Sequence, residues 1–259
     1  MKMKMEEPRE LVQSVSRALD ILEEIVLGKE GLSLTEISEN LQLNKSTVHR
    51  LLSTLIYRGY VRREKNSHCY TAGFRLLEIS SSIKEKLDLK QTNVFLTELM
   101  RVTNETVHLG ILHEGEVVYV DKVESEQTIR MHSRLGSRVP IYATSLGKIL
   151  LAYSTPDVVE AIVSDMTFKP LTENTITDAN EFRRQLNEVK NLGYSIDDEE
   201  NEENIRCIGG PIFGSTGQIV AAFSVSGPAF RMTTERLEEL KPVIRDFSKR
   251  MSALFGYGF

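Results

Sequence analysis

The pattern of apolar and polar positions predicts a helix over residues 45–58, with one apolar and one polar face. Its apolar residues fall at i, i+3, i+4 and i+7, namely Val48, Leu51, Leu52 and Leu55. The opposite face carries hydrogen-bond donors, namely Ser46, His49, Arg50, Ser53 and Tyr57. Asn44 is the expected N-cap, and Gly59 stands where the helix is expected to end.

Two further helices are expected upstream. In the nearer one, Ser33 and Glu36 have the spacing of a capping box, and the inward residues would be Leu34, Ile37 and Leu41. The first helix is expected to end at Gly28. Its inward stripe would be Val12, Val15, Leu19, Leu22 and Val26, widened by Ala18 and Ile25.

Two short segments of strand composition, 60–64 and 68–72, follow Gly59 and are joined by a polar turn. Three helices followed by such a ribbon predict a winged helix-turn-helix, which lays its last helix in the major groove of DNA. Between Asn44 and Arg75 there are seven Lys and Arg and a single Glu, which favours DNA over the alternative of a basic winged-helix protein-interaction module. The predicted DNA-contacting residues are Lys45, Ser46, Thr47, His49, Arg50 and Ser53 in the helix, and Arg62, Arg63 and Lys65 in the wing.

The rest of the chain alternates between helical and strand patterns. Helices are expected over 74–89, 92–101, 145–153, 156–163, 178–192 and 233–254, and strands over 106–112, 117–123, 128–132, 194–197, 205–213 and 218–226. Hairpins mixed with helices indicate an α+β domain with an antiparallel sheet. The predicted organisation is a disordered N-terminus (1–8), a winged helix-turn-helix domain (9–73), a linker helix (74–90) and a sheet domain (91–259).

Charge divides the chain in the same way. The net charge is −5, but residues 1–90 hold 15 Lys and Arg against 13 Asp and Glu, whereas residues 91–259 hold 17 against 24. A slightly basic N-terminal segment followed by an acidic C-terminal segment suits a DNA-reading domain joined to a sensor.

The two cysteines lie far apart, there is no apolar run of bilayer length, and the first ten residues lack the apolar core of a signal peptide. We therefore expect a cytoplasmic protein without a membrane partner.

Candidate chemistry in the second part lies in three polar stretches. Residues 143–148 enter a helix whose first N–H groups are free to hold an anion. Asp197 borders a strand, Cys207 lies in another, and Ser224 and Ser226 project from one face of a third. Singly, these have ordinary interpretations: a solvated acidic loop, a small core thiol and serines bonded to backbone. Together they suit a pocket for a small oxygenated acid.

Motifs for catalysis are missing from the sequence. It contains no GxSxG elbow, no HExxH and no Cys-x-x-Cys pair, so we predict no catalytic residue, no metal site and no cofactor. Two alternatives stay open: a metal-sensing regulator that uses Asp197, Cys207 and a histidine, and a small-acid enzyme fused to a DNA-binding module.

From Leu11 to Phe255 the chain resembles the IclR family of bacterial transcription regulators. The segments that carry the resemblance are SVSRALDIL, LSLTEISENLQLNKSTVHRLLSTLIYRGYV, YTAGFRLLEI, IRMHSRLGSRVPIYATSLGKILLA, LGYSIDDEENEENIRCIGGPIF and AAFSVSGP. The resemblance implies a winged helix-turn-helix, a linker helix and an effector domain with a GAF-like or profilin-like sheet.

The resemblance also implies partners and a ligand site. Family members are dimers or tetramers that bind palindromic operators and respond to small carboxylates or aromatic acids. The backbone N–H groups of Ser145 and Leu146 would receive a carboxylate, and the residues closing the pocket would be Asp197, Cys207, Ser224 and Ser226. Many members have Gly-Ala where Ser145-Leu146 stand, so the ligand's identity does not carry over. Within the family, the sequence looks most similar to regulators of sugar-acid or acetate-type catabolism, and a repressor is expected.

Overall fold

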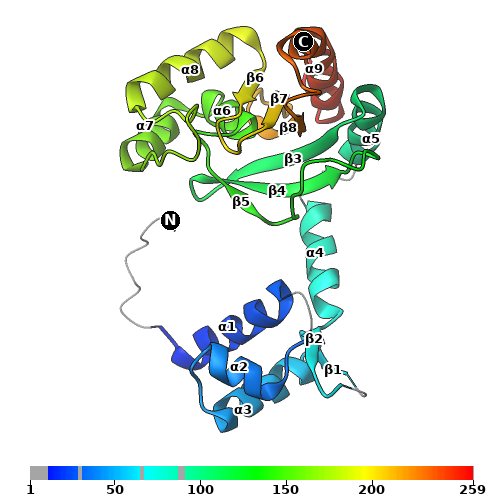
Figure 1. Ribbon diagram of the computed structural model, residues 1–259, viewed down its shortest axis with the longest axis vertical. Helices are drawn as coiled ribbons and strands as arrows, with labels where there is room; N and C mark the ends of the chain where they lie inside the picture. The colour runs from blue at the N-terminus through cyan, green and yellow to red at the C-terminus, as the bar shows by residue number, and fades with distance from the viewer. Residues whose placement is uncertain (1–10, 29–30, 65–66, 87–90, 259) are drawn as a thin grey trace. The chain divides into compact units, whose positions relative to one another are not determined.

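The computed structural model describes residues 11–28, 31–64, 67–86 and 91–258 of the 259-residue chain. Its contacts divide the chain into two compact units, 1–88 and 89–259 (Figure 1). The predicted disorder of 1–8 falls outside the described residues.

The first unit is a winged helix-turn-helix. Its elements are α1 (Gln13–Leu27), α2 (Leu34–Asn40), α3 (Lys45–Tyr57), β1 (Val61–Arg63), β2 (Tyr70–Ala72) and α4 (Arg75–Lys86). The two strands form an antiparallel pair in which Val61 lies opposite Ala72. Seven buried side chains from the helices and the ribbon make its core: Ile21, Ile25, Ile37, Val48, Leu52, Val61 and Tyr70.

Of the two helix N-caps predicted in this unit, one forms its side-chain hydrogen bonds and the other does not. The capping box of Ser33 and Glu36 is confirmed, with both of its hydrogen bonds present. Asn44 stands at the N-cap of α3 but forms no side-chain capping bond there.

The predicted inward stripe of α1 is wrong at most of its positions, although Ile25 is buried and Leu22 packs against the core as predicted. Ile21 and Ile25 face the core, whereas Val12, Val15, Leu19 and Val26 are between 42% and 64% exposed. The helix has two apolar stripes, and only one of them can pack on α2 and α3. The other is left as an exposed apolar face.

The second unit is built on a six-stranded antiparallel sheet in the order β5-β4-β3-β8-β7-β6. The strands are β3 (Thr106–His113), β4 (Glu116–Val123), β5 (Arg138–Val139), β6 (Ser195–Asp198), β7 (Ile205–Phe213) and β8 (Ile219–Pro228). Glu114 and Gly115, both at positive φ, close the β3–β4 hairpin in the way that a tight two-residue turn requires. The chain thus has the α+β architecture that was predicted.

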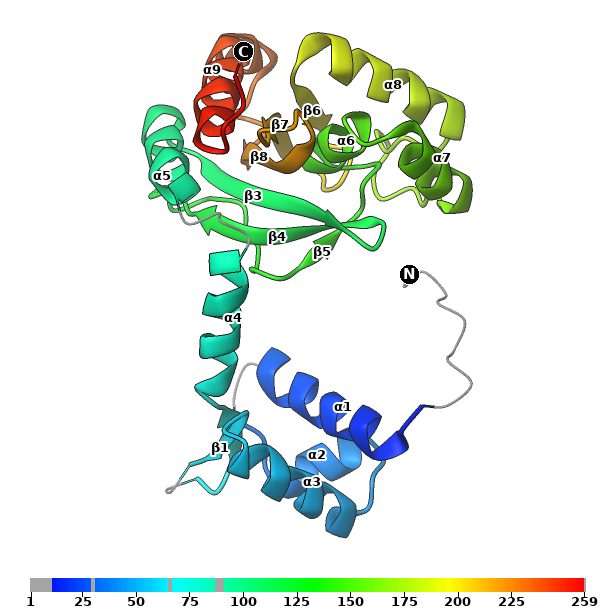
Figure 2. The same ribbon diagram turned by 180° about the vertical axis from the view of Figure 1, so that it is seen from behind.

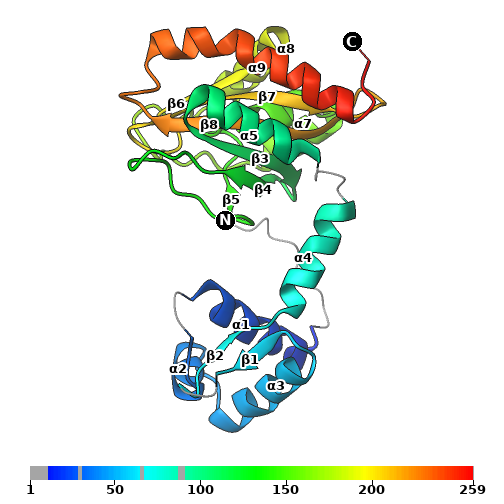
Figure 3. The ribbon, with the colours of Figure 1, turned by 90° about the vertical axis from the view of Figure 1, so that its right-hand side faces the viewer.

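The helices of this unit cover opposite faces of the sheet. They are α5 (Thr92–Thr103), α6 (Ser145–Ala152), α7 (Pro156–Asp165), α8 (Ala179–Leu192) and α9 (Thr234–Leu254). Helices α5 and α9 cover one face, as Figure 3 shows, while α6 lies against the other with α7 and α8 outside it (Figure 2). The face under α5 and α9 is apolar, because Leu109, Ile208, Phe223 and Val225 all belong to one buried cluster.

One predicted strand, 128–132, is wrong. These residues are all described and form a loop, in which Ile129 is 63% exposed and Met131 is buried. The alternation of apolar residues suggested a strand. In the structure the Ile129 carbonyl accepts a hydrogen bond from Arg231 at 2.9 Å, and residues 128–132 pair with no strand of the described sheet. The short strand β5 was not predicted, since two residues carry no periodicity.

Candidate DNA-reading surface and buried effector site

The polar face of α3 is open to solvent. Lys45, Ser46, His49 and Arg50 are exposed, and Thr47 is half-buried. Ser53 is also exposed, but its hydroxyl donates to the carbonyl of His49 at 2.8 Å, so it is engaged within its own helix. Among the described residues neither Lys45 nor Arg50 forms an ion pair, which leaves both cations available to an external partner.

The wing holds its two arginines against its own residues. The Arg62 Nε donates to the Thr71 hydroxyl at 3.1 Å, and its guanidinium lies 5.5 Å from the ring centroid of Phe74. The Arg63 guanidinium lies 3.3 Å from the His68 Nδ1. Such anchored arginines suit the positioning of a phosphate better than the reading of a base. Lys65 lies outside the described residues.

In the second unit, strand register brings the predicted ligand residues into one row. Asp197 lies opposite Cys207, and Cys207 lies opposite Ser226. Directly opposed residues of antiparallel strands project to the same face, so these three side chains share the face that α6 covers. Ser224, two residues from Ser226 on the same strand, projects to this face as well. All four are at most 6% exposed.

The start of α6 lies against the same sheet face. Thr144 caps the helix by accepting from the Gly147 N–H at 3.2 Å, while the N–H groups of Ser145 and Leu146 precede the first intrahelical bonds. The Leu146 side chain reaches β3 beside Gly110, where an added Cβ would lie 3.0 Å from its Cδ1. The structure therefore brings all six predicted ligand residues to the interface between α6 and one sheet face.

The ionisable groups of the row are shifted toward their neutral forms. Burial raises the pKa of Asp197 to about 7, although hydrogen bonds from the backbone N–H groups of Glu200 and Asn201 oppose the shift. Burial, followed by the charge of Asp197, raises the pKa of the Cys207 thiol well above its usual value. Burial therefore favours the neutral thiol of Cys207 over the thiolate.

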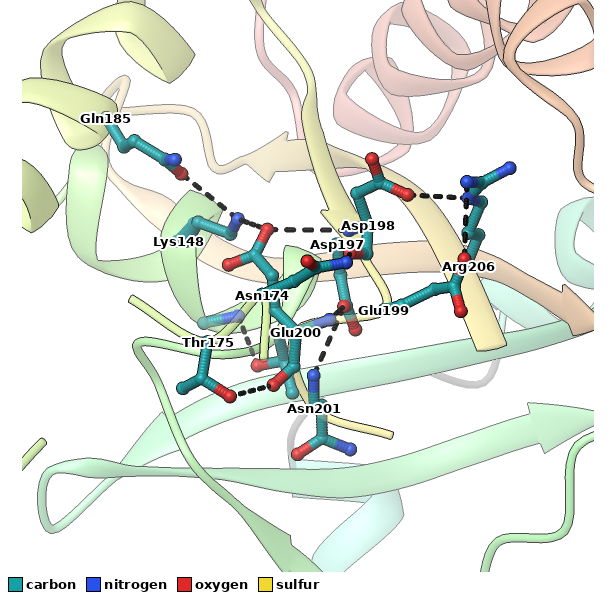
Figure 4. Close-up of polar contacts among 12 residues, drawn as sticks. Lys148, Asn174, Thr175, Gln185, Asp197, Asp198, Glu199, Glu200, Asn201 and Arg206 are labelled. Carbon is teal, nitrogen blue, oxygen red and sulfur yellow. Dashed lines mark hydrogen bonds and ion pairs between the residues drawn. The ribbon is translucent and has the colours of Figure 1, made fainter. Parts of the chain in front are cut away.

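Next to this row lies a buried ion pair that sequence analysis missed. The Lys148 ammonium, 1% exposed, lies 2.5 Å from Glu200 Oε1 and donates to Gln185 at 3.1 Å (Figure 4). Burial raises the pKa of Glu200, while Lys148 opposes that shift. Thr175 donates to the Glu200 carbonyl at 2.7 Å and so holds the turn that carries it. Part of the acidic stretch interpreted as a solvated loop is thus buried.

His108 was also missed. It is fully buried and lies opposite Ser224 on the same sheet face. Its Nε2 is 2.8 Å from the Ser133 hydroxyl, its Nδ1 is 3.3 Å from the Ser226 hydroxyl, and its ring lies 4.8 Å from that of Tyr119. Burial, followed by the charge of Lys122, lowers the pKa of His108 to about 4, so the imidazole is neutral.

Both omissions had a signal in the sequence. Lys148 is the one charged residue of the helical run SLGKILLA, and His108 interrupts the apolar strand TVHLGIL. A lone polar group inside an apolar run is buried with a partner, but the sequence does not say which partner.

The described residues contain no group of three or more His, Cys, Asp and Glu side chains that could hold a metal ion, so geometry lends the metal-sensing alternative no support. Across the same residues, no helix is both long enough and apolar enough to cross a membrane.

Comparison with known proteins assigns both units. Residues 83–253 match the family described as bacterial transcriptional regulator IclR C-terminal, and residues 14–65 match the IclR helix-turn-helix domain. The chain belongs to the IclR family. It is a member of a family of DNA-binding transcriptional regulators with an effector-binding domain, as the resemblance implied.

Individual IclR-family relatives match over nearly their whole length. HTH-type transcriptional regulator KdgR of Escherichia coli is 38% identical, with 95% of this chain and 94% of that protein covered. The acetate operon repressor of Salmonella typhimurium is 29% identical, with 95% and 90% covered. The crystal structure of Thermotoga maritima IclR superposes with a TM-score of 0.84 at 35% identity, covering 95% of this chain and all of that one.

Proposed function

We propose that this protein is a repressor of a carbon-catabolic operon whose affinity for DNA is set by a small carboxylic or sugar acid bound in the second unit. The observation that carries the proposal is the buried row of Asp197, Cys207 and Ser226 on the sheet face that α6 covers. Hydrogen-bonding groups whose pKa values are shifted toward the neutral form, together with free helix N–H groups, suit one carboxylate and several oxygens. A repressor role is supported by relatives that carry that name.

DNA binding is proposed to need a homodimer, or a tetramer of two dimers. The exposed apolar face of α1, defined by Val12, Val15, Leu19 and Val26, is the surface that supports self-association through the first unit. A twofold dimer presents two α3 helices to a pseudo-palindromic operator, in major grooves roughly 34 Å apart. Lys45, Ser46, His49 and Arg50 are proposed to meet base edges, and Arg62, Arg63 and Lys65 to meet phosphates.

The effector changes DNA affinity only as far as it binds the two states of the protein unequally. The test uses the full-length protein, melted thermally with short carboxylic, keto- and sugar acids, because a ligand of the folded state raises the Tm by mass action. We expect one class to raise the Tm, Ser224→Ala to abolish the rise, and the exposed control Ser215→Ala to keep it. A Tm that no acid moves would contradict the proposal.

A further inference from the structure

The effector site does not end at the row of Asp197, Cys207 and Ser226. On the next strand, β3, Thr106 lies opposite Ser226 and His108 lies opposite Ser224, so the polar face continues by one strand. On β4, Tyr119 lies opposite Gly110 and its ring packs on that of His108. These groups come from a part of the chain that the six predicted ligand residues do not include.

The two ring nitrogens of His108 make contacts of different strength. The 2.8 Å contact of Nε2 with Ser133 has normal hydrogen-bond length, and Lys122 fixes the same loop by donating to the Ser133 carbonyl at 2.6 Å. The 3.3 Å contact of Nδ1 with Ser226 is long for a hydroxyl bond. The contact of Nδ1 is therefore the weaker of the two, and a ligand oxygen that hydrogen-bonds to Nδ1 displaces less than one that bonds to Nε2.

This end of the face is suited to a hydroxyl group and not to a second carboxylate. A neutral imidazole offers one donor and one acceptor, which is also what a hydroxyl group offers. Burial raises the pKa of Tyr119, so its hydroxyl is neutral as well. The cation on this side, Lys122, is paired with Glu124 at 2.7 Å.

We propose that His108, held by Ser133 and facing Ser226, is a specificity-determining residue that reads a hydroxyl group of the effector, so that the site selects polyhydroxylated acids over short keto acids and over unsubstituted acids of equal length. The inference rests on the proposed function, since it assumes that the row binds an acid. Three strand spacings separate β3 from β6, which is roughly 14 Å of sheet. A short keto acid is too small to contact His108 on β3 and Asp197 on β6 together, whereas a sugar acid places hydroxyl groups along more of this polar face.

The test measures selectivity on the full-length protein by calorimetric titration. The probes are gluconate, galactonate and xylonate, their unhydroxylated counterparts hexanoate and pentanoate, and pyruvate. For the wild type we expect at least one sugar acid to bind tenfold or more tightly than its counterpart, because a buried site built for a hydroxyl leaves polar groups unpaired without one. His108→Phe keeps the ring but removes both nitrogens, and should reduce that ratio about tenfold.

Further variants separate hydroxyl reading from a packing role. His108→Gln restores a donor and an acceptor and should recover part of the ratio, which a purely structural histidine would not do. Ser133→Ala removes the hydroxyl that orients the His108 ring and should also lower the selectivity ratio. It provides the test if His108→Phe does not fold. His132→Ala, at an exposed neighbouring position, is the matched control and should leave the ratio unchanged.

The outcomes distinguish this inference from the proposed function. If pyruvate binds most tightly, or if the ratio survives His108→Phe and Ser133→Ala, the role of His108 is overturned and acid sensing stands. If none of the probes binds the wild type, acid sensing and the role of His108 are both overturned.

Discussion

The two units place their proposed functional residues in opposite environments. In the first, the α3 residues proposed to meet DNA are solvated, and Lys45 and Arg50 form no ion pair within the described chain. In the second, the residues proposed to meet the effector are buried, and the neighbouring Lys148 and Glu200 form an ion pair with each other. A surface site can change without loss of fold, whereas a buried polar site is also part of the core and its mutation affects binding and stability together.

The largest expected effect comes from breaking the buried ion pair. Lys148→Met leaves the Glu200 carboxylate without its cation, which should lower the free energy of unfolding of the sheet unit by about 3–5 kcal/mol. Urea unfolding followed by circular dichroism measures the loss. Lys148→Met combined with Glu200→Gln should regain much of it, because no buried charge remains. Lys190→Met at an exposed position is the control, and an equal loss there would show that the pair has no special role.

The next effect is a pH dependence in which His108 and Asp197 act with opposite signs. His108 has a folded pKa of about 4 against an ordinary 6.5, so the unfolded chain binds more protons in this window and stability is lost as pH falls from 6.5 to 4. Asp197 has a folded pKa of about 7 against 3.8, so its stability is present at low pH and is lost as pH rises through the same window. The full contribution is about 3 kcal/mol for His108 and about 4 kcal/mol for Asp197.

Variants separate the two contributions. In His108→Phe only the Asp197 contribution remains of the two, so stability should fall as pH rises from 4 to 6.5. In Asp197→Asn the His108 contribution remains and stability should rise over that range, opposed in part by Glu200, whose pKa is also raised by burial. Urea midpoints at half-unit pH steps measure both slopes. Equal slopes in the two variants would contradict the assignment.

How far the sequence predicts each site follows from the same difference. Helix α3 and its exposed hydrogen-bond donors could be predicted directly, because helical periodicity fixes which residues face outward and solvated residues need no partner in the chain. The effector face required strand register, which pairs Asp197 with Cys207 and Cys207 with Ser226 across three strands. Residue types together with the family resemblance named these positions, but only the order β3-β8-β7-β6 brings them together and adds His108.

The errors have physical causes too. Helix α1 carries two apolar stripes, and periodicity cannot say which one packs inside, so Val12, Val15 and Leu19 were assigned to the core although they are exposed. The loop 128–132 alternates as a strand does, but the carbonyl of Ile129 is bound by the side chain of Arg231, which lies far away in the chain. Tertiary contacts decided both cases, and no local pattern encodes them.

In the first unit, a single exposed residue proposed to meet base edges should matter for DNA binding alone. Arg50→Ala should cost about 1–3 kcal/mol of affinity for the preferred operator and relax the preference at particular bases, without lowering the Tm. Anisotropy titrations with DNA selected from a random library measure it. Arg184→Ala, which removes an exposed arginine of α8 paired with Glu181 and Glu188, is the control. If Arg50→Ala lowered the Tm as well as the affinity for DNA, the contrast between the two units would not hold.

The smallest effect is expected at the wing. Arg63 is exposed, held by His68 and proposed to meet a phosphate, so Arg63→Ala should weaken binding to all DNA sequences alike. The slope of log K against log salt should become shallower by roughly 0.9, because one phosphate fewer is neutralised, while the base preference stays that of the wild type. Titrations at several salt concentrations with preferred and scrambled duplexes measure both quantities. A changed base preference with an unchanged salt slope would place Arg63 in a groove and reverse its role with that of Arg50.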